Sequence, residues 1–229
     1  VLIEDAAESF GAMYDGKMTG TFGKDNAISF NGNKIITGSS GGMLLTDDAS
    51  AAATARKWST QSREKAPWYQ HEELGYNYRM SNVIAGVVRG QLPYLQEHIN
   101  QKKAIYERYK KAFSDLPVAM NPYDEERSSP NFWLSCLLID GDAMCEQVRT
   151  STSASYISAK GKTCPTEILD TIAAYNAEGR PIWKPMHLQP LYKDCPFVSA
   201  DDGSDIGRDI FERGLCLPSD NKMTPEQQD

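Results

Sequence analysis

The chain has 229 residues, of which 40% are hydrophobic and 24% are charged, a composition typical of a globular protein with one or two cores. The formal net charge of −7 argues against nucleic acid as the main partner, because a polyanion binds to a basic surface. No apolar run is long enough for a membrane span, and the five cysteines contain no Cys-x-x-Cys pair, which argues against a zinc site or a disulfide framework and favours reduced thiols in the cytoplasm.

Three short strands are predicted in the first part of the chain. The run "VLIED" (1–5) has the continuous apolar pattern of a strand that is buried on both faces of a parallel sheet. The runs "NAISF" (26–30) and "GGMLLT" (41–46) predict two further strands.

Helices are predicted after these strands. Residues 48–64 indicate a helix that is capped by Asp47 or Asp48. A long helix, or two abutting helices, is predicted to begin at Ser81 and run to residue 114, with apolar side chains at helical spacing. Pro93 should kink or interrupt it.

The composition changes after residue 115, where the sequence becomes rich in proline and charge. We therefore predict two domains, residues 1–115 and 116–229. The second domain is expected to be α+β, with a strand at "FWLSCLLID" (132–140) and short strands at "RPIWKP" (180–185) and "GLCLPS" (214–219).

Two amphipathic helices are predicted within the second domain. They are "DAMCEQVRT" (142–150) and "TCPTEILDTIAAYNAEG" (163–179), the second ended by Gly179.

Both ends of the chain lie within predicted elements. It opens directly on an apolar strand and stops shortly after the Thr-Pro-Glu helix start at residues 224–226. These features predict a piece of a longer polypeptide, and a chain that begins in this way should expose an apolar sheet edge and face.

One lysine in the first domain has unusual neighbours. Lys34 lies among serines, glycines and apolar residues, after a predicted strand that contains Ser29, while Asp5 ends the first strand. A lysine in a confined, weakly polar setting is a nucleophile that can form a Schiff base with a carbonyl or with pyridoxal 5'-phosphate (PLP). Such a cofactor also needs an acid at its pyridine nitrogen and hydroxyl or amide groups at its phosphate. Taken alone, each feature is more often a surface lysine, a turn-forming aspartate or an ordinary glycine loop.

Four ordered motifs resemble the DegT/DnrJ/EryC1/StrS family of PLP-dependent sugar aminotransferases, and most closely the bacillosamine-type enzymes. They are "EDAAES" (4–9), "SFNGNKIIT" with "GGM" (29–43), "GYNYRMSN" (75–82) and "RPIWKPMHLQP" (180–190). The resemblance runs over nearly the whole chain. It implies the α/β fold of fold-type-I, aspartate-aminotransferase-like enzymes, with residues 1–115 as the C-terminal part of the large PLP-binding domain and 116–229 as the small α+β domain.

The resemblance also implies roles for individual residues near the cofactor. Lys34 would bond PLP covalently and carry the proton between the cofactor and substrate carbons. Asp5 would pair with the pyridine nitrogen, and Ser29 would bind the phosphate. Glu8 stands where many relatives have Gln or His near the cofactor ring, which leaves its role open.

Three further residues carry implied roles away from that lysine. Asn77 would reach the phosphate in the neighbouring subunit of a homodimer with shared active sites. Arg79 would bind an anionic substrate or form a structural salt bridge. His187 would contact the sugar or nucleotide, or would be a hydrogen-bonded loop histidine.

The function implied by the resemblance is transfer of an amino group, with glutamate as the expected donor, to C4 of a nucleotide-linked 4-keto-6-deoxy sugar. Relatives have a long segment before the "EDAA" strand that supplies part of the cofactor site. Two alternatives therefore stay open for this chain: a non-catalytic remnant that associates with a partner, and a PLP-binding regulatory protein of the same fold. The run "HEEL" (71–74) is not the HExxH motif of zinc peptidases. The presence of Lys34 disfavours the dehydratase branch, which has His at this position.

Overall fold

The structure is a computed structural model that describes residues 1–201 and 203–229. The chain forms two compact units. The first comprises Val1–Lys103 with Tyr123–Trp133, and the second comprises Ala104–Pro122 with Leu134–Asp229. The sequence predicts a domain boundary after residue 115. In the structure, the first unit ends at Lys103 and also contains the later segment Tyr123–Trp133.

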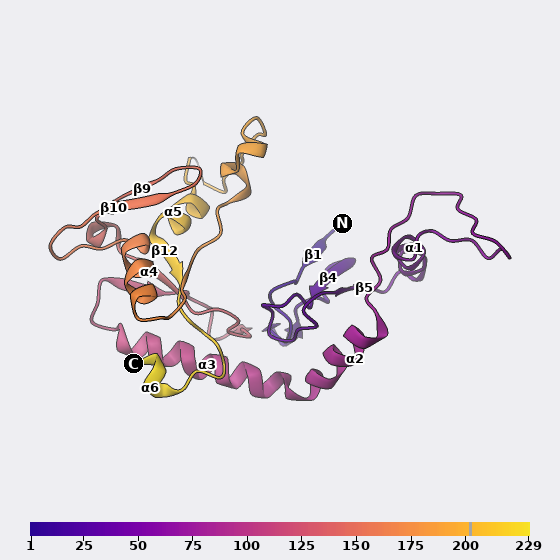
Figure 1. Cartoon of the computed structure of the whole chain (residues 1–229), viewed down its shortest axis with the longest axis horizontal. Helices are drawn as coiled ribbons and strands as arrows, with labels where there is room; N and C mark the ends of the chain where they lie inside the picture. The colour runs from indigo at the N-terminus through magenta and orange to yellow at the C-terminus, as the bar shows by residue number, and fades with distance from the viewer. Residues whose placement is uncertain (202) are drawn as a thin grey trace. The chain divides into compact units, whose positions relative to one another are not determined.

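The main sheet of the first unit has three strands, in the order β1 (Ile3–Asp5), β4 (Asp25–Ser29) and β5 (Gly42–Thr46) (Figure 1). Strand β1 runs parallel to β4, with Asp5 paired to Ala27, and β4 runs antiparallel to β5. All three strands lie within the ranges predicted from the sequence to within one residue. The parallel pair places the carboxyl ends of β1 and β4 at the same edge of this sheet.

The prediction that the first strand is buried on both faces is wrong for this chain. Leu2 and Ile3 are 60% and 72% exposed, and Met43 and Leu44 on β5 are 49% and 47% exposed. The cause is that β1 pairs only with β4, and no described element covers this apolar surface. The expectation of an exposed apolar edge and face is thereby confirmed.

A second, smaller sheet in the first unit joins segments far apart in sequence. Its strands are β2 (Met13–Tyr14), β3 (Lys17–Met18) and β7 (Ser128–Ser129), in the order β3-β2-β7. Next to it, Arg127 forms a bidentate ion pair with Asp15. This pairing brings the segment before Trp133 to the first unit.

The helices of the first unit begin at the predicted caps. Helix α1 (Ala49–Ser59) is capped by Asp48, and α2 (Asn82–Gln91) is capped by Ser81, each side chain accepting from helix-start amides. Pro93 lies in a 3₁₀ turn, η1 (Leu92–Tyr94), that separates α2 from α3 (Leu95–Ala112). The predicted first helix is too long, since α1 ends at residue 59.

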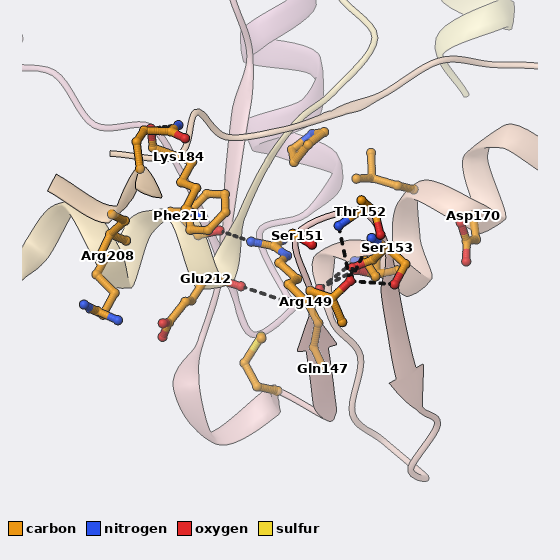
Figure 2. Close-up of a pocket in the computed structure, with 18 of the residues that line it drawn as sticks. Gln147, Arg149, Ser151, Thr152, Ser153, Asp170, Lys184, Arg208, Phe211 and Glu212 are labelled. Atoms are coloured by element: carbon orange, nitrogen blue, oxygen red, sulfur yellow. Dashed lines mark hydrogen bonds between the residues drawn. The ribbon is translucent and has the colours of Figure 1, made fainter. Parts of the chain in front are cut away.

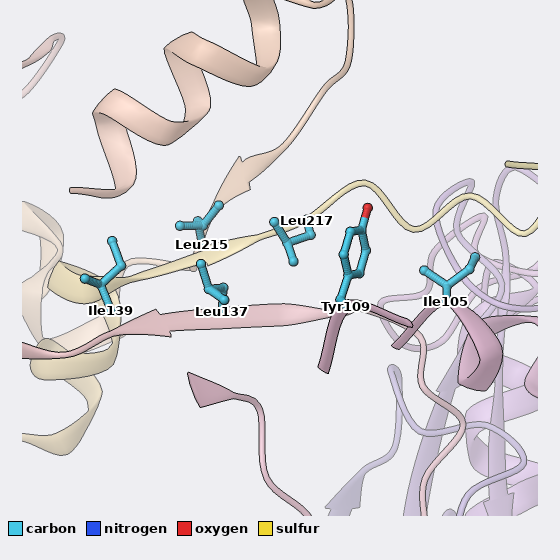
Figure 3. Close-up of a cluster of buried hydrophobic side chains, with 6 residues drawn as sticks. All are labelled: Ile105, Tyr109, Leu137, Ile139, Leu215 and Leu217. Carbon is cyan, nitrogen blue, oxygen red and sulfur yellow. The ribbon is translucent and has the colours of Figure 1, made fainter. Parts of the chain in front are cut away.

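The second unit is built on a four-stranded sheet in the order β11-β12-β8-β6. Its strands are β6 (Val118–Met120), β8 (Cys136–Ile139), β11 (Arg180–Pro181) and β12 (Gly214–Cys216). Figure 3 shows its core, where side chains of α3 meet those of β8, β12 and the residue after β12. The members of this cluster are Ile105, Tyr109, Leu137, Ile139, Leu215 and Leu217. The predicted strands in this domain exist but are shorter than predicted.

The predicted helix at residues 142–150 is wrong. This segment contains a 3₁₀ turn, η2 (Gly141–Ala143), and strand β9 (Glu146–Arg149). Strand β9 forms an antiparallel hairpin with β10 (Ala154–Ile157). The pairing supplies backbone hydrogen bonds that a short amphipathic pattern cannot reveal by itself.

The second predicted helix is confirmed but ends early. Helix α4 (Pro165–Ala174) stops before Gly179, since Asn176 adopts a left-handed φ of 59° and thereby breaks the helix. Helices α5 (Ile206–Arg213) and α6 (Pro225–Gln228) follow, the latter at the predicted Thr-Pro-Glu start with a complete capping box. Two further 3₁₀ turns are η3 (Met186–Leu188) and η4 (Pro190–Tyr192). Among the described residues, no helix has the length and apolarity to cross a bilayer.

Candidate active site

Lys34 lies in a confined position with two neighbours. Its Nζ is 3.2 Å from Oε1 of Glu8 and 4.3 Å from the centre of the Trp133 ring. The Lys34 side chain is only 11% exposed, whereas the Glu8 side chain is 55% exposed. The predicted confinement is present, but the surroundings include a carboxylate and are not weakly polar throughout.

Trp133 is a site residue that the sequence analysis missed. Its side chain is buried, and its Nε1 donates to the carbonyl of Asn33 at 2.5 Å, directly before the lysine. Trp133 and Asn33 are 100 positions apart in sequence, so no local sequence pattern indicates this contact. The ring therefore holds both the backbone and the side chain at this point of the loop.

Asn131 connects the Glu8 loop to the Trp133 turn. Its Nδ2 donates to the carbonyls of Glu8 (2.9 Å) and Phe10 (3.2 Å), and its Oδ1 accepts from the Trp133 amide (3.0 Å). Asn131 is only 6% exposed, so these bonds satisfy a buried amide. Phe132 between them adopts a φ of 52°, a conformation that persists only where the surroundings fix it.

Asp5 and Ser29 end the two parallel strands at the same sheet edge. The exposed carboxylate of Asp5 accepts one hydrogen bond from the Ala7 amide at 3.1 Å, as a turn-forming aspartate does. The Ser29 hydroxyl accepts from the Asn31 amide at 3.2 Å. Opposite Ser29 stands Gly42, where an added Cβ would lie 2.6 Å from the Ile28 carbonyl oxygen, so only glycine fits.

Glu4, the acid directly before Asp5 in sequence, has a structural role. Its two oxygens accept from the amides of Gly20 (2.6 Å) and Phe22 (2.8 Å). Partial burial raises the pKa of Glu4, but the hydrogen bonds from Gly20, Phe22 and Gly23 outweigh that effect, and the pKa lies below its usual 4.5. This carboxylate anchors the loop before β4 to β1.

Asn77 and Arg79 line a pocket of about 620 Å³ in the first unit, and Lys34 is not among its lining residues. Both are exposed, and the pocket also contains the start of α2 with its cap Ser81. No ion pair of Arg79 is present among the described residues, and its role as a substrate ligand or a salt-bridge partner stays a prediction. A guanidinium, an amide and a helix N-terminus together suit an anionic group.

His187 lies in the second unit, within η3. Its Nε2 is 2.8 Å from Oδ2 of Asp205, and its ring stacks on Phe197 with centroids 3.9 Å apart. The structure thus shows the hydrogen-bonded loop histidine, held by the residue that also caps α5. Substrate contact by His187 stays a prediction.

The second unit also has an open cavity of about 1040 Å³, shown in Figure 2. Arg149 from β9 crosses it, donating to the Phe211 carbonyl at 2.7 Å and stacking on that ring at 4.6 Å. Burial lowers the pKa of Arg149. Hydroxyl side chains of residues 150–153 form part of the wall, and none of the sequence-predicted site residues lines this cavity.

The residues around Lys34 fit PLP. The chain offers a confined primary amine, a hydroxyl at the end of β4, and a carboxylate at the end of β1 on the same sheet edge. An amine can bond the cofactor aldehyde, and a carboxylate suits a protonated pyridine nitrogen. No cluster of three or more metal-ligating side chains is found in the described part of the chain.

Comparison with known proteins places these residues in context. The chain is 41% identical over 227 residues to EpsN of Bacillus subtilis, which is named as a pyridoxal phosphate-dependent aminotransferase, and it covers 53% of that protein. It is 30% identical over 227 residues to the GDP-perosamine synthase of Escherichia coli, of which it covers 55%. In both cases 99% of this chain is matched, so the chain spans about half the length of these relatives.

The fold has matches among solved structures. A DegT DnrJ EryC1 StrS aminotransferase from Brucella abortus superposes with a TM-score of 0.77 at 24% identity, over 99% of this chain and 54% of that one. This likeness confirms the predicted fold-type-I α/β class. The sequence model of the DegT/DnrJ/EryC1/StrS aminotransferase family matches residues 1–229, and the chain belongs to this family of PLP-dependent enzymes.

Proposed function

We propose that the protein moves an amino group from glutamate to C4 of a nucleotide-linked 4-keto-6-deoxy sugar, with PLP as cofactor, in the cytoplasmic synthesis of polysaccharide or glycan precursors. The observation that carries the proposal is the confined amine of Lys34 between Glu8 and Trp133, with Glu8 and Lys34 on the loops that follow the strands ended by Asp5 and Ser29. Family membership and the similarity to a GDP-perosamine synthase support the substrate class.

The chain's own residues have distinct parts in this proposal. When bound, PLP supplies the aldehyde that takes up the amino group and an electron sink for the substrate carbon. Lys34 would hold the cofactor, and its Nζ would move the proton between the reacting carbons. The Glu8 carboxylate, 3.2 Å away, orients that amine. The Asp5 carboxylate holds a proton at the pyridine nitrogen, and the Ser29 hydroxyl binds phosphate.

We propose that the pocket of Asn77 and Arg79 forms part of the active site of a second copy of the chain. No hydrogen bond or ion pair in the described residues joins either side chain to Lys34, which leaves their polar groups available to a ligand held by another subunit. We therefore infer a homodimer with shared sites, in which this pocket takes up the phosphate of the cofactor or of the substrate.

The test uses the protein encoded by the complete reading frame that contains this chain. The purified protein, with PLP added, is incubated with glutamate and a nucleotide-linked 4-keto-6-deoxy sugar. Mass spectrometry should find the amino sugar and 2-oxoglutarate in equal amounts. Lys34→Ala should abolish both products, whereas Lys24→Ala, which removes an exposed lysine paired with Asp48, should leave them unchanged.

Two outcomes would contradict the proposal. A folded protein that binds PLP at Lys34 without turning over any of a panel of keto-sugar nucleotides would support a regulatory role. A folded protein that binds no PLP would support a non-catalytic remnant.

A further inference from the structure

The two central strands of the second unit place a pair of thiols face to face. Cys136 on β8 and Cys216 on β12 are direct partners in the antiparallel register. Their Sγ atoms lie 3.7 Å apart, although the residues are 80 positions apart in sequence. Figure 3 shows the neighbouring pair on the same strands, Leu137 and Leu215, within the core.

The backbone at this pair has the geometry that brings side chains closest. The Cys136 amide donates to Oδ1 of Asn121, and the Cys136 carbonyl accepts from the Asn121 amide, both at 2.9 Å. The flanking residues Leu217 and Ser135 do bond each other across the strands. Cys136 and Cys216 therefore form a non-hydrogen-bonded pair, for which Cα atoms are about 4.5 Å apart, within the usual disulfide range of about 4.4–6.8 Å.

The two cysteines differ in their exposure to solvent. Cys136 is partly exposed, while Cys216 is 4% exposed. An oxidant in solution therefore meets Cys136 first, and the buried thiol beside it can resolve the product. A third cysteine, Cys195, is exposed and lies on a different segment, which provides a natural control.

We propose that Cys136 and Cys216 form a reversible intramolecular disulfide when the protein meets hydrogen peroxide. The Cys136 thiolate attacks one peroxide oxygen, the O–O bond breaks, and a sulfenic acid forms as water leaves with the released proton. The Cys216 thiolate then attacks the sulfenic sulfur, the S–O bond breaks, and a second water leaves. Two thiols and one peroxide become one disulfide and two waters, with two electrons passing from sulfur to oxygen. A dithiol reverses the reaction by exchange.

The bond would join the middle of the sheet and close the segment from 136 to 216, which contains β9, α4, His187 and α5. Closing so long a loop restricts the unfolded chain. The melting temperature should rise by about 5–15 °C on oxidation and return with dithiothreitol.

The experiment treats the folded protein with hydrogen peroxide, blocks remaining thiols with iodoacetamide, and digests with trypsin and an aspartate-directed protease. The second protease is needed because cleavage at Asp140 and Asp142 separates Cys136 from Cys145. The expected product is a peptide pair linked through Cys136 and Cys216, two hydrogens lighter than the sum of its parts. It should vanish in Cys136→Ser and in Cys216→Ala and persist in Cys195→Ser.

The peptide map of the unmutated protein keeps the test decisive if the variant at the buried position fails to fold. The proposal is wrong if peroxide leaves both cysteines alkylatable in a protein whose circular dichroism is unchanged. It is also wrong if the linked peptides join Cys145 to Cys164, or if Cys136 proceeds to sulfonic acid without a link.

Discussion

The position of Lys34 depends on residues far from it in the chain. The Trp133 ring covers its Nζ and anchors the carbonyl before it, while Glu8 approaches from the loop after β1. Asn131 binds that loop and the tryptophan turn together. The amine is thus oriented by a small network of tertiary contacts and not by its own loop alone.

Trp133 is predicted to be a positioning residue for Lys34. Trp133→Leu removes the ring contact and the Nε1 hydrogen bond, each worth about 1 kcal/mol, so the yield of a borohydride-reducible PLP adduct at Lys34 should fall several-fold. Trp133→Phe keeps an aromatic ring but not the Nε1 donor and should recover part of that yield. Trp183→Leu, an exposed tryptophan of the second unit, is the control. Equal yields in all variants would show that the contact does not position the amine.

Asp5 is predicted to act through its charge. In the complete enzyme, Asp5→Asn should keep PLP bound but slow a single turnover with glutamate by about a hundredfold or more, because an amide cannot hold the proton at the pyridine nitrogen. Asp47→Asn, in the exposed loop before α1, serves as the control. If the variant reacts at the unmutated rate, Asp5 has only a structural role, as the acceptor of the hydrogen bond from the Ala7 amide in its turn.

At the scale of elements, the helix caps are predictable from the sequence, whereas the pairing of β9 is not. Asp48 and Ser81 were predictable caps because a cap is decided within four residues. Strand β9 was predicted as a helix because its pairing with β10 is absent from the local pattern. The hydrogen bond from Trp133 to the Asn33 carbonyl could not be predicted for the same reason, because no window of sequence around either residue records a contact across 100 positions.

Glu4 makes the stability of the first unit depend on pH. Glu4→Gln should lower the free energy of unfolding by about 2 kcal/mol at neutral pH, because a neutral group replaces a carboxylate that accepts hydrogen bonds from two backbone amides. The folded pKa lies below 4.5, so the contribution is complete above that value and is lost as the pH falls through the folded pKa.

Between neutral pH and pH values below 4.5, the difference in the free energy of urea unfolding between Glu4→Gln and the unmutated chain should therefore shrink. Glu72→Gln changes an exposed acid and should show no such difference. A gap that stays constant over this pH range would rule out the carboxylate as its source.

At the scale of the whole molecule, the residues proposed for one reaction come from both compact units of the chain. Lys34 is within its network, Asn77 and Arg79 line a pocket with no described bond to it, and His187 belongs to the other compact unit. The apolar surface of β1 and β5 is also exposed. The proposed homodimer with shared sites would give the pocket of Asn77 and Arg79 a ligand held by a second copy of the chain.

Mixing two inactive variants of the complete protein tests the shared site. Lys34→Ala and Asn77→Ala, dissociated and reassociated together, should recover roughly a quarter of the unmutated activity, because half of the dimers are mixed and each carries one intact site. The same treatment of each variant alone is the control. No recovery, with mixed dimers demonstrated by native mass spectrometry, would place both residues in the same subunit's site or outside it.

The identity of the lysine that holds the cofactor tests the account most directly. The protein from its complete reading frame is incubated with PLP, reduced with borohydride, digested, and searched for the pyridoxyl group by mass spectrometry. We predict one modified peptide, carrying the group on Lys34, and its loss on prior addition of glutamate, which would release the lysine. A pyridoxyl group spread over exposed lysines such as Lys24 and Lys160, with Lys34 unmodified, would contradict the assignment of the site and the proposed reaction with it.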